Sequence, residues 1–511
     1  MDVVADGESL TIDQVVQVAR RGAPVRLALP ERFYDSRRLV ESGSVGTKPV
    51  YGVNTGFGLL ATIPIPQDQI QELQHNLLMS HAAGVGEPAP TEICRAMLLL
   101  RLNALAKGYS GVRKEVVQLL AEMLNRRVHP IIPTRGSVGA SGDLAPLAHL
   151  ALVMIGLGEA EHQGCRLSGS EALERAGLRP LTLEVKEGLA LINGTQFMSA
   201  FGALALHDAD SLVEASEIAC ALSIEAFKGS MRPSDPRLQS VRPHPGQIAS
   251  AAHIYALLDG SPIVASHQQD CPRVQDPYSL RCAPQVFGAV REGLAFARGI
   301  IARELNSATD NPLCFPESGE IISGGNFHGQ PIALALDVAK IALAHMGNFS
   351  DRRSYRLLSS SFSALSPFLA KNPGLNSGYM VAQYTSASLC AENGILAVPS
   401  SIHSISTSAG MEDFNSLGAT SAVQLRTMVE NVQRIVAIEL LCAVQGVEQH
   451  RPLQTTSPLE AAIACIRQVV PPLERDRPLS GEIEQVVGLI REAVLQAEVK
   501  KAFRLRGTNK K

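Results

Sequence analysis

The chain has 511 residues, more than a single hydrophobic core usually holds, so two subdomains or one large helical body are expected. Aromatic residues make up only 4% and Trp is absent, as expected for an aliphatic core of packed helices. A net charge of -3 excludes the strongly positive electrostatic field of a nucleic-acid-binding protein. Nine cysteines without C-x-x-C spacing favour reduced thiols over disulfides or zinc. With no signal peptide and no apolar run of membrane length, we predict a cytoplasmic protein with no metal, nucleic-acid or membrane partner.

The periodicity of apolar residues predicts a mainly α fold. The first forty residues mix short β-like runs, such as Leu10–Ile12, with turns. Further elements are then expected in order: helices over 33–42, 67–83, 91–107 and 144–156, a hairpin with a short helix over 158–182, and long helices over 201–228, 284–306, 327–358 and 420–448. Helices this long pack into a bundle. We therefore predict a smaller mixed N-terminal domain (1–200), a helical bundle and C-terminal helical region (201–511), and a solvated basic tail from Lys500.

The tripeptide Ala140-Ser141-Gly142 suits an internal condensation of the backbone. Because Gly142 has no Cβ, its nitrogen can approach the Ala140 carbonyl, and loss of water would close a five-membered ring. Loss of a second water from Ser141 would leave an exocyclic methylidene. The product is a methylidene-imidazolone (MIO), a strong electrophile that the twenty ordinary side chains do not offer.

Other interpretations of this stretch fail on sequence. A nucleophile elbow requires G-x-S-x-G, but Asp143 stands where the last glycine belongs. A phosphate-binding loop requires G-K-[ST], and no lysine is near. An ordinary loop is the remaining alternative. Asp143 is expected to cap the helix that begins at Leu144, and Pro146 is tolerated in its first turn.

The run from Gly136 to Leu150 resembles the signature of the MIO-dependent aromatic amino acid lyases. Five further blocks resemble those of the family and stand in its order: Tyr51–Gly58, Ser80–Gly86, Asn193–Gln196, Gln275–Arg281 and Gly324–His328. The similarity runs from about residue 10 to about residue 490, and the length resembles that of the bacterial histidine ammonia-lyases. The resemblance implies a homotetramer with shared active sites, an MIO group formed from Ala140, Ser141 and Gly142, and no dissociable cofactor.

The same resemblance implies catalytic and binding roles. Tyr51 would remove the β-proton of the substrate, because a phenolate is a stronger base than a carboxylate. The alternative is a packed tyrosine at the end of a strand, although the flanking glycines favour a mobile loop. Arg281 would hold the substrate carboxylate through a bidentate fork, although an arginine there is also an ordinary ion-pair partner. Tyr278 and Asn193 would donate hydrogen bonds around the MIO and the amine, and Gln275 would orient that layer.

Substrate choice depends on fewer positions. Glu412 stands where histidine lyases carry a glutamate and where phenylalanine and tyrosine lyases and aminomutases usually have glutamine. A carboxylate there can accept a hydrogen bond from an imidazole N–H, whereas beside a phenyl ring it would be a buried charge without a partner. His81 and Met380 are also of the histidine type. Phe327 is expected to pack near the prosthetic group, unless it is an ordinary core phenylalanine.

The sequence departs from the histidine type around this glutamate. Histidine lyases typically read Asn-Gln-Glu-Asp-His, but here Met411 and Phe414 replace the glutamine and the histidine. Tyr384 and residues 400–403 also differ. These changes leave MIO formation untouched and put the exact substrate in question, because a more apolar rim suits other aromatic amino acids.

We therefore predict an ammonia-lyase that converts L-histidine to trans-urocanate and ammonia, the first step of histidine degradation. Three alternatives remain open: a phenylalanine or tyrosine ammonia-lyase or aromatic 2,3-aminomutase on the same scaffold, a serine hydrolase that uses Ser141, and a catalytically silent partner subunit. A substrate panel, labelling by an organophosphonate, and the presence or absence of turnover distinguish them.

Overall fold

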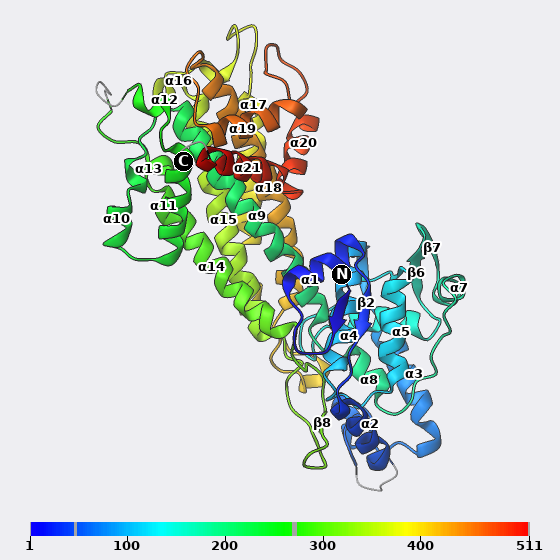
Figure 1. Cartoon of the computed structure of the whole chain (residues 1–511). Coiled ribbons are helices and arrows are strands. Elements are labelled where there is room, and N and C mark those ends of the chain that lie inside the picture. Colours follow the sequence, from blue (N-terminus) through cyan, green and yellow to red (C-terminus); the bar gives the residue numbers. More distant parts are fainter. Residues whose placement is uncertain (1, 45–48, 268–272, 509–511) are drawn as a thin grey trace. The chain divides into compact units, whose positions relative to one another are not determined.

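Helices dominate the chain and the mainly α fold is confirmed (Figure 1). The computed structural model describes residues 2–44, 49–267 and 273–508. The chain forms two units, the first from Met1–His207, Ala297–Asp337 and Pro399–Arg426, and the second from Asp208–Phe296, Val338–Val398 and Thr427–Lys511. The opening segment of the first unit ends close to the boundary placed at residue 200, but two later segments join it. The division into domains 1–200 and 201–511 stays a prediction.

The first unit combines helices with small β-sheets. Its helices up to residue 192 are α1 (Ile12–Arg21), α2 (Glu31–Ser44), α3 (Ile70–His81), α4 (Thr91–Ala106), α5 (Lys114–Asn125), α6 (Leu144–Met154), α7 (Gly169–Arg175) and α8 (Glu187–Ile192). Strands β1 (Val3–Ala5) and β2 (Val25–Leu27) pair in parallel. The other pairs are antiparallel: β3 (Val85–Pro88) pairs with β5 (Pro133–Arg135), and β8 (Leu313–Phe315) pairs with β9 (Glu320–Ile322). In the three-stranded sheet, β6 (Glu159–His162) lies between β4 (Val128–Pro130) and β7 (Cys165–Ser168).

The predicted helices and the hairpin lie where the periodicity placed them, with one correction near the N-terminus. Leu10–Ile12 is not a β-run, because Ile12 begins α1 and Thr11 caps it. The Thr11 hydroxyl accepts from the Gln14 N–H and the Gln14 side chain accepts from the Thr11 N–H, which forms a capping box. The hydrogen bonds between Thr11 and Gln14 therefore favour the start of a helix over the strand that the alternation of apolar residues suggested.

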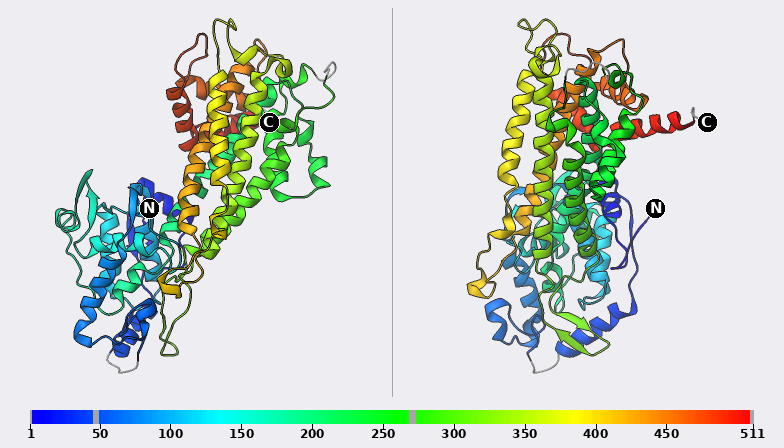
Figure 2. Two further views of the ribbon diagram at one scale, coloured as in Figure 1. Left: turned by 180° about the vertical axis from the view of Figure 1, so that it is seen from behind. Right: turned by 90° about the vertical axis from the view of Figure 1, so that its left-hand side faces the viewer.

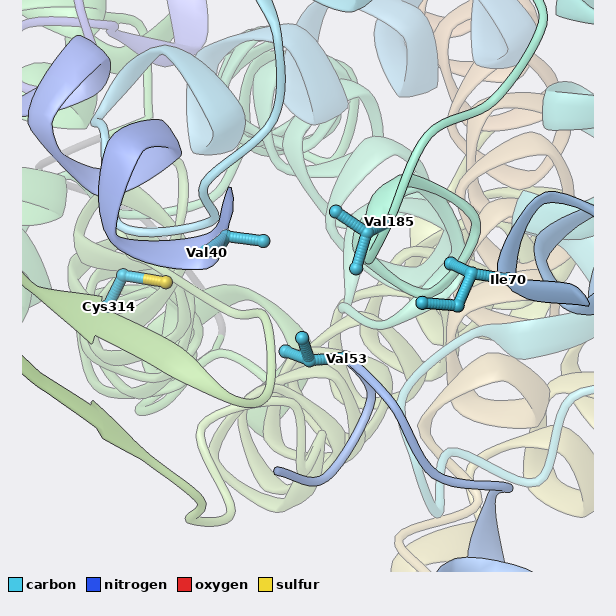
Figure 3. Packing of buried hydrophobic residues seen from close by; sticks show 5 residues of the cluster. All are labelled: Val40, Val53, Ile70, Val185 and Cys314. Atoms are coloured by element: carbon cyan, nitrogen blue, oxygen red, sulfur yellow. The ribbon is translucent and has the colours of Figure 1, made fainter. Parts of the chain in front are cut away.

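Apolar side chains from distant segments meet in the first unit (Figure 3). Val40 from α2, Val53, Ile70 from α3, Val185 and Cys314 from β8 form one buried cluster. The cluster joins the segment that contains Tyr51 to the segment that leads into α8. These two segments therefore depend on the same core for their positions.

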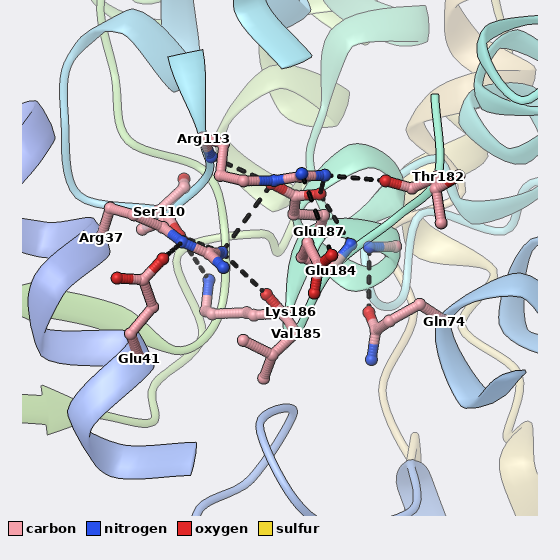
Figure 4. Close-up of polar contacts among 12 residues, drawn as sticks. Arg37, Glu41, Gln74, Ser110, Arg113, Thr182, Glu184, Val185, Lys186 and Glu187 are labelled. Carbon is pink, nitrogen blue, oxygen red and sulfur yellow. Dashed lines mark hydrogen bonds and ion pairs between the residues drawn. The ribbon is translucent and has the colours of Figure 1, made fainter. Parts of the chain in front are cut away.

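Polar contacts fix the start of α8, the short helix that ends immediately before Asn193 (Figure 4). The Glu187 carboxylate is fully buried and accepts from the Arg113 guanidinium at 2.7 and 2.8 Å. Gln74 Oε1 accepts from the Gly188 N–H at 2.9 Å, and Lys186 Nζ donates to Asp310 Oδ2 at 2.6 Å. Buried charges are tolerated when they are paired and hydrogen-bonded, so these contacts hold α8 in one position.

Long helices form the core of the second unit (Figure 2). The chain passes between the two units within four of them: α9 (Gln196–Ala226), α14 (Ala283–Glu304), α15 (Gln330–Leu358) and α18 (Gly418–Glu448). Further helices of this unit are α10 (Pro236–Ser240), α11 (Pro245–Leu258), α12 (Pro262–Ala265), α13 (Tyr278–Arg281), α16 (Ser360–Ser363), α17 (Met380–Leu396), α19 (Ser457–Val469), α20 (Ser480–Arg491) and α21 (Val494–Thr508). The predicted long-helix bundle is confirmed.

A buried carboxylate ties three of the bundle helices together. Glu439 of α18 accepts from Arg353 of α15 at 2.5 and 2.7 Å, and both side chains are fully buried. The hydroxyls of Ser223 (α9) and Ser350 (α15) donate to the same carboxylate at 2.7 and 2.6 Å. Each oxygen of the Glu439 carboxylate therefore accepts from two donors.

Two expectations about this unit require correction. Helix α15 is long and apolar enough to span a bilayer, although the sequence suggested no such run; 61% of its apolar window is buried inside the protein, as in the core helix of a soluble protein. The basic tail is helical as far as Thr508 and is therefore not a frayed end, although Lys500 is largely exposed as predicted. Lys500 donates to Glu214 at 2.8 Å and Arg506 donates to the Asp259 carbonyl.

The Arg353–Glu439 pair gives a first prediction. Arg353→Met should lower the free energy of unfolding by about 3–5 kcal/mol, because it leaves Glu439 buried without its cation. The double variant Arg353→Met/Glu439→Leu should recover most of this loss, since no unpaired charge remains. Denaturant unfolding of the three proteins measures the difference, and a double variant less stable than the single one would contradict the interpretation.

Candidate active site

The Ala140–Gly142 turn is pressed against a second turn, at Asn193–Thr195. Gly142 and Gly194 form an isolated parallel bridge, and the Asp143 N–H donates to the Gly194 carbonyl at 2.7 Å. Gly142 has φ of 77°, and a Cβ at this position would lie 2.2 Å from the Gly194 carbonyl oxygen. Only glycine fits here, since both the backbone conformation and the space exclude a side chain.

The hydrogen bonds around the tripeptide leave free the groups that ring closure consumes. Ser416 Oγ donates to the Gly139 carbonyl at 3.0 Å, and Asn193 Nδ2 donates to the Ser141 carbonyl at 3.0 Å. Within the described residues, no hydrogen bond involves the Ala140 carbonyl, the Ser141 N–H or the Gly142 N–H. Backbone groups are almost always paired when buried, and Ala140 is only 5% exposed. The turn therefore fits an MIO precursor: its flanks are fixed and its reacting groups are unengaged.

Asp143 caps a different helix from the predicted one. Its side chain makes no capping bond with α6, which begins at Leu144. Instead Oδ2 accepts from the N–H groups of Phe197 and Met198 at 3.0 Å each, in the first turn of α9, and Oδ1 accepts from the Ser137 hydroxyl at 2.9 Å. Asp143 thus ties the loop of the tripeptide to the segment that follows Asn193. Burial raises the pKa of this carboxyl to about 7, although its hydrogen bonds oppose the shift.

Glu412 reaches the tripeptide directly. Ser141 Oγ donates to Glu412 Oε1 at 2.6 Å, and Thr407 Oγ1 donates to Oε2 at 2.7 Å. Asn415, which is fully buried, donates to Thr407 Oγ1 at 3.2 Å and to the Ile405 carbonyl at 2.6 Å. Both oxygens of the carboxylate are therefore held, one by the residue that would lose its hydroxyl and the other by a supported threonine.

The same carboxylate influences Tyr51 and His81. Burial raises the pKa of Tyr51; the Gly58 backbone hydrogen bond opposes this and Glu412 adds to it. For His81, burial lowers the pKa, while the Leu77 carbonyl, 2.9 Å from Nδ1, and Glu412 raise it. Tyr51, His81, Ser141 and Glu412 thus share one electrostatic environment in the first unit. The shift at Tyr51 is opposite to the one that would form a phenolate in the isolated chain.

The residues that depart from the histidine pattern lie beside Glu412 on exposed chain. Met411 is 58% exposed and Phe414 is 56% exposed. The Phe414 ring stacks on His328 with centroids 6.1 Å apart, and His328 Nε2 lies 3.0 Å from the Phe414 carbonyl oxygen. Phe327, next to His328, belongs to the same unit and is half-buried.

Four of the predicted site residues belong to the second unit. Gln275 and Arg281 are hydrogen-bonded to each other, and the Arg281 guanidinium lies over the Tyr278 ring at 4.6 Å. Gln275 and Arg281 also line a cavity of about 750 Å³. Met380 begins α17 and is half-buried. The predicted site therefore divides into a first-unit group around Ser141 and a second-unit group around Arg281.

Comparison with known proteins identifies the family. The family model for aromatic amino acid lyases matches residues 10–468. The chain belongs to the aromatic amino acid lyase family. Within that family it is 52% identical over 504 residues to histidine ammonia-lyase from Anaeromyxobacter sp. (strain K), covering 97% of this chain and 99% of that protein.

Solved structures of the family show the same fold. The crystal structure of histidine ammonia-lyase from Trypanosoma cruzi matches with a TM-score of 0.91 and 43% identity, over 98% of this chain and 96% of that one. Tyrosine aminomutase from Streptomyces globisporus matches with a TM-score of 0.93 and 38% identity, over 98% and 99%. The scaffold alone therefore does not separate ammonia-lyase from aminomutase.

Several residues that shape this lyase site escaped the sequence analysis. Thr407, Asn415 and Ser416 carry no signal, because serine, threonine and asparagine are common in loops. Arg101 did carry one, since it interrupts an apolar helical run in which every residue from Ile93 to Ala106 is buried. It donates to the Asn193 carbonyl at 2.8 Å.

Asp143 gives the second prediction. The folded protein keeps the proton of this carboxyl up to about pH 7, whereas the unfolded chain releases it near 3.8. The folded state binds more protons between these values, so stability falls as pH rises through the window. Asp143→Asn keeps an acceptor for α9 and should remove this part of the dependence, at most about 1.4 kcal/mol per pH unit. Unfolding at about pH 5 and about pH 8 measures it; parallel profiles for the two proteins would contradict it.

Proposed function

We propose that this lyase eliminates ammonia from L-histidine to give trans-urocanate, using an MIO group that forms from Ala140, Ser141 and Gly142. The carrying observation is that the Ala140 carbonyl, the Ser141 N–H and the Gly142 N–H are unengaged while their neighbours are fixed. The MIO group supplies an electrophile that captures the substrate amine and makes it a leaving group. Asn193 would hold the ring carbonyl, because its amide already donates to that oxygen.

The selection of histidine is assigned to Glu412. Its Oε1 accepts from the Ser141 hydroxyl at 2.6 Å. Dehydration of Ser141 removes this donor, so the carboxylate oxygen becomes available to an N–H group of the substrate. Thr407 remains on Oε2 and keeps the carboxylate oriented. His81 and Met380 are assigned to the same pocket by resemblance, and Phe327 to the side of the ring.

The assignment of Tyr51 as the base requires a contribution from elsewhere. Burial and Glu412 raise its pKa, so positive charge or further donors must act on it for a phenolate to form. Arg281, Tyr278 and Gln275 belong to the second unit, and Tyr278 is 69% exposed. We propose that these residues complete the site from another subunit of a homotetramer, where Arg281 binds the substrate carboxylate. The tetramer would be cytoplasmic and use no dissociable cofactor.

An aminomutase, or a lyase acting on phenylalanine or tyrosine, is the second candidate. The likeness to tyrosine aminomutase and the apolar Met411 and Phe414 favour it. Glu412 opposes phenylalanine as the substrate, because a phenyl ring offers no donor to the Oε1 atom that the Ser141 hydroxyl occupies in the unprocessed chain.

Tyr51→Phe tests the base. The chain should still lose two water molecules, because the tyrosine hydroxyl takes no part in the contacts that fix the tripeptide. Turnover should fall by about 10²–10⁴-fold, the usual contribution of a general base. Intact-protein mass spectrometry and a near-ultraviolet assay for urocanate measure the two effects, with Ser141→Ala as the control that should lose both. Retained turnover in Tyr51→Phe would remove it as the base.

Glu412→Gln tests the selector. Loss of a hydrogen bond to a charged group is worth about 1.5–3 kcal/mol, so kcat/KM for histidine should fall by about 10–100-fold while that for phenylalanine and tyrosine should not. Asp413→Asn, which neutralises the adjacent exposed carboxylate, serves as the matched control. An equal fall for all three amino acids, or none for histidine, counts against Glu412 as the residue that chooses the substrate.

A further inference from the structure

The turn that faces the tripeptide has its own support on the other side. Gly194 contacts Gly142 through its peptide group, and a Cβ at Gly194 would lie 2.4 Å from Arg101 Nη1. The same Cβ would lie 2.4 Å from Gln196 Oε1 and 2.8 Å from Thr309 Oγ1. Gly194 is therefore in tight contact with both the tripeptide and a buried guanidinium, and has no room to retreat.

Hydrogen bonds from Arg101 hold both ends of this turn, at Asn193 and at Gln196. Nη1 donates to the Asn193 carbonyl and to Gln196 Oε1, each at 2.8 Å. Gln196 Nε2 in turn donates to Thr309 Oγ1 at 2.9 Å. The Asn193 side chain binds the Ser141 carbonyl, so Arg101 fixes the main chain of the residue whose amide holds the tripeptide.

Packing alone does not account for an arginine at this position. Arg101 is fully buried, forms no ion pair within the described residues, and leaves Nε and Nη2 without hydrogen-bond partners there. Burial lowers the pKa of its guanidinium to about 10, opposed by Asp310, so it is charged at neutral pH. A buried unpaired cation is unfavourable, and a leucine or methionine would fill an aliphatic core better. Because burial of the Arg101 cation costs free energy without a compensating ion pair, its role is expected to lie in the turn that it supports.

We propose that Arg101 is a positioning residue for formation of the MIO group, an inference that rests on the function proposed above. By holding the Asn193–Gly194 peptide in place, Arg101 keeps this peptide packed against Gly142. That contact would press the Gly142 nitrogen toward the Ala140 carbonyl carbon.

The step that depends on Arg101 is the first condensation. The bond from the Gly142 nitrogen to the Ala140 carbon forms, and the Gly142 N–H proton passes to the Ala140 oxygen. That oxygen then leaves as water with the Ser141 N–H proton, and a C=N bond forms between the Ala140 carbon and the Ser141 nitrogen. The second water, from the Ser141 Cα–H and Cβ–OH bonds, comes after ring closure. A chain that fails at Arg101 should therefore retain both waters.

A matched control lies on the same helix. Arg95 of α4 is also buried and also donates to backbone carbonyls, those of Val18 and Leu124, which lie away from the tripeptide. Its replacement should disturb the stability of α4 as much as replacement of Arg101 does. Maturation should be affected only by Arg101.

The test compares Arg101→Lys, Arg101→Met and Arg95→Met in the full-length protein. Each is refolded from denaturant, its folded fraction is isolated, and intact mass and near-ultraviolet absorbance are followed with time. The Arg101 variants should form the two-water-lighter species about a hundredfold more slowly, since misplacement of reacting groups by about 1 Å costs about that factor. Arg95→Met should mature like the wild type. Gln196→Met, which removes one acceptor of Nη1, should mature more slowly than the wild type and decides the matter if neither Arg101 variant folds.

The outcomes separate the two proposals. Folded Arg101→Met or Gln196→Met that loses both waters at the wild-type rate overturns the role of Arg101. Equal slowing in Arg95→Met also overturns it, because general destabilisation of α4 then explains the effect. A wild-type protein of full unmodified mass overturns the proposed function itself.

Discussion

Contact between the Gly142 and Gly194 backbones is the constraint on which the site depends. Ring closure requires an amide nitrogen to approach a carbonyl carbon within the same short turn, a geometry that a free chain avoids. In this chain the Gly194 peptide group packs against Gly142 so closely that a Cβ there would lie 2.2 Å from its carbonyl oxygen, and on our proposal this contact favours the approach. The Gly194 peptide group is held in place because α8 is anchored at Glu187 and Gly188 before it, and α9 is capped by Asp143 after it. Packing and polar contacts would thus promote ring closure of the tripeptide without an added reagent.

A single carboxylate links the precursor to the working site. In the unprocessed chain Glu412 has a donor on each oxygen, so it is a satisfied, partly buried acid. In the proposed maturation, dehydration of Ser141 would delete one of these donors, while Thr407 would still hold the other oxygen. Its Oε1 would then be a free acceptor in the environment of Tyr51 and His81. Glu412 acts to raise the pKa of both residues, although burial, the larger effect, lowers the pKa of His81. On this proposal, the chemistry that builds the electrophile would also prepare the recognition of the substrate.

The sequence alone predicted the features that depend on a repeating pattern of apolar residues or on a short motif. The long helices follow from apolar stripes, and Ala140-Ser141-Gly142 follows from residue types that few other functions require together. The cap formed by Asp143 could not be assigned, because a residue adjacent to α6 bonds to α9, more than fifty positions later in the chain. Arg101 escaped for the same reason, because its partners Asn193 and Gln196 lie more than ninety positions later in the chain. Thr407 is only five positions from Glu412 and escaped because threonine is common in loops.

The division of the site residues between the units has a mechanistic consequence. Every contact that fixes the tripeptide comes from the first unit: Gly194 and Asn193, Ser416, and the carboxylates of Asp143 and Glu412. Arg281, which is proposed to bind the substrate carboxylate, and Gln275, which is proposed to orient the surrounding layer, are in the second. On the proposed function, formation of the electrophile would draw on the packing of one unit, whereas turnover would also draw on charged groups of the second. Burial, more than Glu412, raises the pKa of Tyr51 within the first unit, so a phenolate would need donors or positive charge from elsewhere.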